Sequence, residues 1–173
     1  MTFLIGTLAI IQGYATSLGV GASTLAILNF FAAIADGKID DTERRMMGIV
    51  YVVLRVAMVA ILLSTLALLH LQFIYAGLDS FTMLQWGQLL ALAMLFINAI
   101  LMTAHKMPTT FGPAIQAGNW YTLGFLTSLK ALGIVNFSTS QFFLAYITWL
   151  VLAVAIVNGA MALLKAKRHG FLK

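Results

Sequence analysis

Five long apolar segments divide this 173-residue chain and constrain its fold more than any other feature. Their approximate ranges are 14–35, 47–70, 82–104, 113–134 and 142–164. About 20 apolar residues cross the hydrocarbon core of a bilayer as one helix, and a helix satisfies its backbone polar groups internally. The pattern predicts an all-α polytopic membrane protein whose five transmembrane helices form a single domain over residues 1–173.

The composition excludes the main soluble classes. Hydrophobic residues make up 62% of the chain and charged residues only 9%, whereas soluble domains carry about 25% charged residues. The chain contains no cysteine, so it forms no disulfide and offers no thiolate ligand to a metal. We therefore expect an integral protein of a bacterial or archaeal cytoplasmic membrane, with membrane lipids among its partners and with neither a metal site nor a nucleic-acid partner.

The first apolar segment is longer than one crossing requires, because the stretch from Phe3 to Ile11 is apolar as well. This extension either lengthens the first helix at a tilt or lies along the membrane interface. Gln12 and Gly13 indicate a break between the extension and the span. Within the span, small residues at Ala15, Gly19 and Ser23 predict close contact with another helix.

The basic residues occupy alternate connections. The first connection holds Lys38, Arg44 and Arg45, the third holds Lys106, and the C-terminal tail holds Lys165, Lys167, Arg168 and Lys173. The second and fourth connections contain no lysine or arginine. Because cytoplasmic connections are enriched in these residues, five spans place the N-terminus outside and the C-terminus inside.

Arg55 lies eight residues beyond Met47, about 12 Å along the second helix. An arginine at such depth costs about 2.5–3.5 kcal/mol on insertion scales, so we expect it not to face lipid. Hydrogen-bond acceptors for it could come from Asn29, Asn98, Gln116 and Asn119. Such a site would hold an anion or a lipid headgroup; alternatively, Arg55 forms a clamp between helices or extends toward the cytoplasmic surface.

No carboxylate falls inside the predicted spans, which disfavours proton- or sodium-coupled transport. The leading hypothesis is a non-enzymatic, channel-like or carrier-like protein for an ion or small solute. Arg55 would be its electrostatic element, and the amides of Asn29, Asn98, Gln116 and Asn119 would form the polar wall.

Two other functions remain open. The chain could be an accessory subunit of a larger membrane complex, with Arg55 and the polar residues as assembly contacts. For any of these functions we expect a homo-oligomer or a partner in a membrane complex, because short-looped helices leave little interior for a binding site of their own. It could also be a redox protein that binds haem or quinone. We predict no cofactor. His70 and His105 fall at opposite ends of the predicted bundle and cannot ligate one iron together, which leaves a haem with a single histidine ligand as the open alternative.

The first connection resembles the second half of a calcium-binding EF-hand loop over eight residues. Ala32 and Ile34 occupy the positions of the first two ligands, and neither can coordinate calcium. The same residues fit a helix cap, in which Asp40 is the N-cap and Glu43 completes a capping box. We therefore predict a structural role for both acids.

Overall fold

In the computed structural model the chain forms five α-helices and one short 3₁₀ helix, with no strand in the ranges 1–36, 40–108 and 110–168 that the structure describes. The elements are α1 (Thr2–Asp36), α2 (Asp41–Ala76), η1 (Leu78–Ser80), α3 (Met83–Thr103), α4 (Gly112–Ala131) and α5 (Thr139–Arg168). The all-α prediction is confirmed. Four helices, α1, α2, α3 and α5, are long and apolar enough to cross a membrane.

The predicted break at Gln12 and Gly13 is wrong, because α1 is one continuous helix of 35 residues. Gln12 is buried against α2, where its Nε2 donates a hydrogen bond to Thr65 Oγ1 at 2.8 Å. A polar residue that suggested a break is therefore a contact between helices. At 1.5 Å per residue, α1 is about 52 Å long, which exceeds the ~30 Å hydrocarbon thickness.

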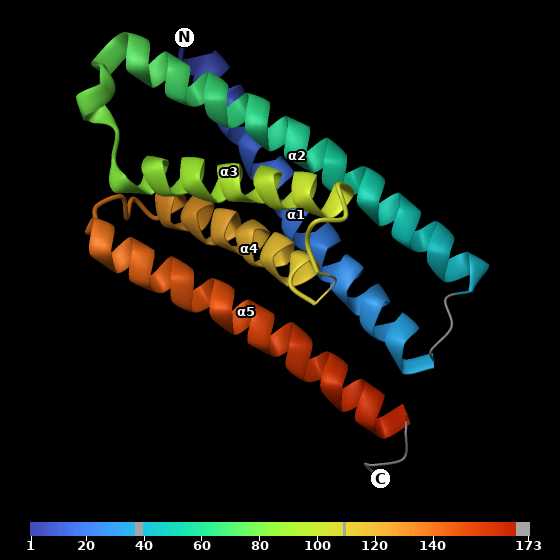
Figure 1. Ribbon diagram of the computed structural model, residues 1–173. Helices are drawn as coiled ribbons and strands as arrows, with labels where there is room; N and C mark the ends of the chain where they lie inside the picture. The colour runs from blue at the N-terminus through green and yellow to red at the C-terminus, as the bar shows by residue number, and fades with distance from the viewer. Residues whose placement is uncertain (37–39, 109, 169–173) are drawn as a thin grey trace.

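The fourth predicted span forms helix α4 but lacks the apolar composition of the other four. Its sequence includes Gln116, Asn119 and Lys130. The other helices shield it: α4 lies between α3 and α5 and also packs against α1 (Figure 1). Because neighbouring helices cover much of α4, Gln116 is half-buried and Asn119 is fully buried.

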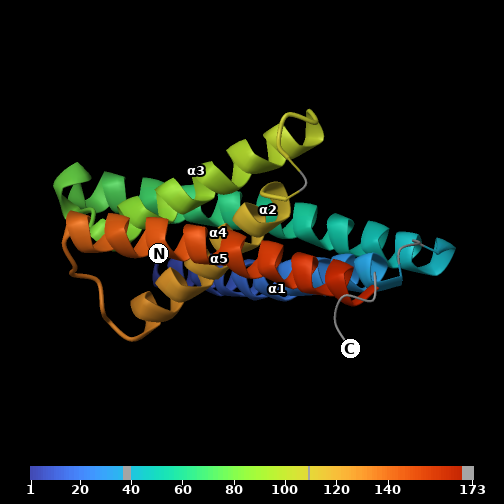
Figure 2. The ribbon, with the colours of Figure 1, turned by 60° about the horizontal axis from the view of Figure 1, so that its bottom comes forward.

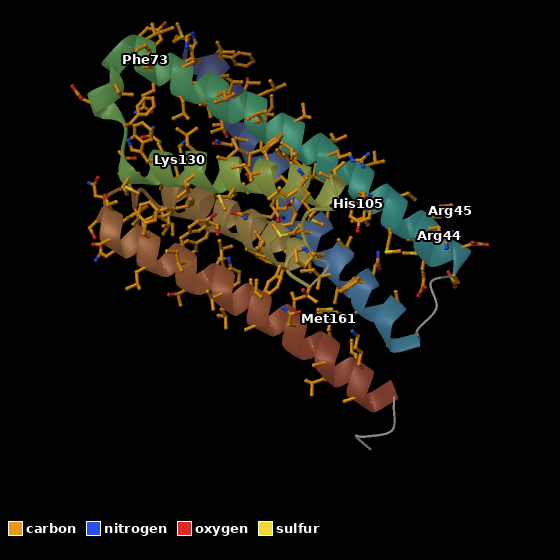
Figure 3. All side chains as sticks on the ribbon, in the orientation of Figure 1. Arg44, Arg45, Phe73, His105, Lys130 and Met161 are labelled. Carbon is orange, nitrogen blue, oxygen red and sulfur yellow. The ribbon has the colours of Figure 1, made fainter. Side chains whose placement is uncertain are left out.

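Successive helices run in alternating directions, so the start of α1 and the end of α5 lie at opposite ends of the bundle (Figures 1 and 2). At one end, Tyr75 OH of α2 contacts Met1 Sδ at 3.5 Å. Arg44, Arg45 and His105 are placed toward the other end (Figure 3). The membrane side of each connection, inferred from the lysines and arginines, stays a prediction.

The capping prediction for α2 is confirmed. Asp40 Oδ1 accepts a hydrogen bond from the Glu43 backbone N–H at 2.6 Å, and Glu43 Oε2 accepts one from the Asp40 N–H at 3.1 Å. These two bonds satisfy backbone donors that the first turn would otherwise leave unpaired.

The predicted small-residue contact on α1 is also present. Ala15 and Ser23 are each only 3% exposed, and Gly19 between them lies directly against the indole ring of Trp120 on α4. Trp120 is the largest of the fully buried side chains. The absence of a side chain at Gly19 lets α1 and α4 approach with this ring between them.

Candidate functional site

Two of the predicted site residues, Asn98 and Gln116, meet where α3 packs on the beginning of α4. Asn98 is 2% exposed, and its Nδ2 donates to the backbone oxygen of Gly112 at 2.9 Å and to Gln116 Oε1 at 2.8 Å. Gln116 Nε2 in turn lies 3.8 Å from Met58 Sδ of α2. The cluster joins three helices, so its geometry is that of an interhelical clamp.

Asn119, another of the four predicted amides, holds a different pair of helices together. It is fully buried, and its Oδ1 accepts a hydrogen bond from Tyr146 OH of α5 at 2.6 Å. Its Nδ2 donates to the backbone oxygen of Ile115 at 2.8 Å. Trp149 Nε1 adds a second link from α5, to the oxygen of Gly118 at 2.9 Å. Asn119 therefore secures α5, whereas Gln116 secures α3.

The structure does not bring Arg55 or Asn29 to these clusters. Arg55 is exposed on the outer face of α2, next to the buried Leu54. Its guanidinium has no hydrogen bond or ion pair with residues in the described part of the chain. Asn29 is half-buried on α1 and is also separate from the Asn98 cluster. A pathway that uses Arg55 stays a prediction, but a single copy of this chain does not assemble its wall.

The described chain also contains a groove between α1, α4 and α5, with a volume of about 1610 Å³. Near the C-terminal end of α1, three apolar side chains pack against α5. They are Ile27, Phe30 and Phe31, and their partners on α5 are Val157 and Met161. The two helices separate from there toward the start of α5 (Figure 1), and the C-terminal half of α4 forms the floor between them. The groove is therefore closed at one end by packing and open along its side.

The wall of the groove is aromatic and uncharged. Its aromatic members are Tyr14, Tyr121, Phe125, Phe137, Phe142, Tyr146 and Trp149, and its lining includes no Asp, Glu, Lys, Arg or His. Thr16, Thr122 and Thr127 donate their hydroxyls to backbone oxygens of their own helices at 2.7, 2.9 and 2.8 Å. Because these donors are already used, the wall offers mainly apolar and aromatic surface to a ligand.

Glycines open the space on the α1 side. A Cβ atom built at Gly13 or Gly21 meets nothing within 4 Å, although both residues line the groove. With Ser17 between them, they repeat every four residues on one face of α1. This second row of small residues was not predicted, although its spacing is the same as that of the row at Ala15, Gly19 and Ser23.

Comparisons of the chain with protein-family models, curated proteins and solved structures find no match.

Proposed function

We propose that this chain is a membrane protein that binds an uncharged, elongated hydrophobic molecule in the groove between α1, α4 and α5. The observation that carries the proposal is the groove itself, about 1610 Å³ in volume and lined by aromatic rings. Small-molecule pockets commonly measure about 300–1,000 Å³, so this space is large enough for a long chain. The side opening favours entry from the bilayer, as in a carrier-like or storage protein.

The chemistry of the wall supports an uncharged ligand. A charged group placed among these rings would lose its hydration and find no opposite charge in return. Aromatic rings such as Phe125 and Phe142 provide large contact areas for hydrocarbon chains and for flat rings. Acyl chains, isoprenoid chains and quinone-like ring compounds belong to this ligand class.

The alternative of an ion or small-solute pathway receives less support from the geometry. Its proposed charged element, Arg55, is outside the bundle, and Asn98, Gln116 and Asn119 are engaged in contacts between helices. The cavity that Gln116 does line has a volume of about 50 Å³. A passage would therefore need contributions from another chain.

The binding proposal can be tested with an uncharged quinone that carries a ten-carbon tail. It is titrated into the protein in phosphatidylcholine nanodiscs while tryptophan fluorescence is followed, because Trp149 lines the groove. We expect saturable quenching that weakens at least tenfold in Gly21→Leu, whose added side chain occupies the groove.

Gly48→Leu on α2 is the matched control. A Cβ at Gly48 also meets nothing within 4 Å, but this residue lies outside the groove. Its affinity should equal that of the unmodified protein. Quenching that does not saturate, or that both variants reduce equally, would contradict the proposal.

A further inference from the structure

We propose that the outer face of α2 around Arg55 binds a transmembrane helix of another membrane protein, one that carries an aspartate or glutamate at the depth of Arg55. This inference is independent of the groove, to which α2 contributes no lining residue. It rests on α2 crossing a membrane, for which the helix is long and apolar enough.

Arg55 lies well inside the apolar surface of α2. Arg55 lies ten residues from Arg45, about 15 Å along the helix. Between them, Met46, Ile49 and Val52 are exposed apolar residues, with 51%, 60% and 57% of their surface accessible. The apolar surface of α2 thus continues well past Arg55 toward the helix start. If Arg45 marks the headgroup region, Arg55 lies near the middle of the ~30 Å hydrocarbon layer.

The fold of one chain leaves this guanidinium without an acceptor in the described ranges. Arg55 is exposed and has no hydrogen bond or ion pair within the described ranges. A guanidinium presents five N–H donors and retains its proton in proteins. At this depth it requires an acceptor, and a carboxylate is the acceptor whose geometry and charge match it best.

A second copy of this chain cannot supply the acceptor for Arg55. All five acids of the chain lie at helix ends or in connections, at positions 36, 40, 41, 43 and 79. A second copy in the same membrane orientation would bring another Arg55 to this depth and no carboxylate. Charge complementarity therefore favours a different protein that supplies the acid.

The face around Arg55 has the spacing of a helix-packing seam. Its exposed apolar residues follow one another at alternating intervals of three and four: Ile49, Val52, Val56, Val59, Leu63 and Leu66. This interval is the one by which a helix keeps a continuous seam against a partner helix. Arg55 flanks the seam next to Val56, a position at which charged residues commonly select the partner.

The test uses the full chain in phosphatidylcholine vesicles with synthetic leucine-rich transmembrane peptides as probes. One peptide carries a central aspartate, one carries leucine at that position, and one carries the aspartate near its end. Because the chain contains no cysteine, Gly159→Cys on α5 provides a single site for a fluorescent label, and a Cβ there meets nothing within 4 Å. Association is measured by energy transfer to a labelled peptide.

We expect the central-aspartate peptide to bind at least about tenfold more tightly than the other two, as charge-assisted hydrogen bonds typically provide. Arg55→Leu should abolish this preference and Arg55→Lys should retain part of it.

Equal binding of all peptides would overturn the proposal, and so would self-association of the protein that Arg55→Leu removes. Loss of the preference when phosphatidylglycerol is added would assign Arg55 to lipid phosphate instead. Gly21→Leu should bind the peptide normally, which separates this outcome from failure of the groove proposal.

Discussion

Replacing Gly19 by alanine should destabilise the bundle, although alanine is the better helix former. A Cβ atom at Gly19 would overlap three ring atoms of Trp120, namely Cζ3, Cε3 and Cη2. These atoms belong to a rigid ring whose side chain is fully buried, so the ring cannot move into open space. The strain must instead separate α1 from α4 or force Trp120 away from its preferred rotamer.

The expected change in unfolding free energy is the cost of overpacking against Trp120 less the gain in helix propensity. Extra methylene groups in a packed core cost about 1–3 kcal/mol, and complete loss of a buried tryptophan side chain costs about 3–5 kcal/mol, which sets an upper limit. Alanine regains about 1 kcal/mol over glycine within a helix. Because three ring atoms are affected, we expect the upper part of the overpacking range and a net loss of about 2 kcal/mol.

The measurement is the free energy of unfolding in mixed micelles, obtained by titration with sodium dodecyl sulfate and followed by helical circular dichroism. Gly21→Ala is the matched control, since it lies two residues further along α1 and its Cβ meets nothing within 4 Å. This control should be neutral or more stable by up to about 1 kcal/mol. The same alanine substitution should therefore act with opposite sign at two neighbouring positions.

A second variant tests whether the contact with Trp120 causes the loss of stability in Gly19→Ala. In a Trp120→Leu background, Gly19→Ala should lose most of its penalty, because residues in direct contact show coupled effects. If Gly19→Ala proves as stable as Gly21→Ala, close packing of α1 on α4 through this ring is refuted. A penalty that persists unchanged without the indole would refute Trp120 as its origin.

Three further predictions concern caps and polar contacts. Asp40→Ala should lower the unfolding free energy by about 1 kcal/mol in the same titration, because the α2 capping box is lost, whereas Asp40→Asn should retain most of it. Asn98→Leu should cost about 1–3 kcal/mol, because the amide joining α3 to Gly112 disappears; an unchanged midpoint would contradict the clamp. The backbone is left-handed at Gly133, with φ 73°, and at His105, with φ 55°. In the same titration, Gly133→Ala should therefore lower the unfolding free energy by about 1 kcal/mol, whereas His105→Gly should not lower it.

Much of the fold follows from local sequence features. The apolar segments become helices, the Asp40–Glu43 spacing forms a capping box, and the row at Ala15, Gly19 and Ser23 forms a close helix contact. These features are predictable because helix formation, capping and the spacing of small residues depend on neighbours within about one turn. The break predicted at Gln12 was wrong because the hydrogen-bond partner of this residue, Thr65, is 53 residues away in the sequence.

The arrangement of the candidate sites depended on tertiary structure. The sequence suggested one polar site, yet packing places Asn98 and Asn119 in separate clamps and Arg55 on the outer face of α2. The groove arises because α1 and α5 meet near Phe30 and separate toward Gly13, an angle that no local pattern specifies. Composition and periodicity determined that the chain forms long apolar helices. Which faces meet, and where a space remains, was decided by contacts between distant residues, since many helix orientations satisfy the same local pattern.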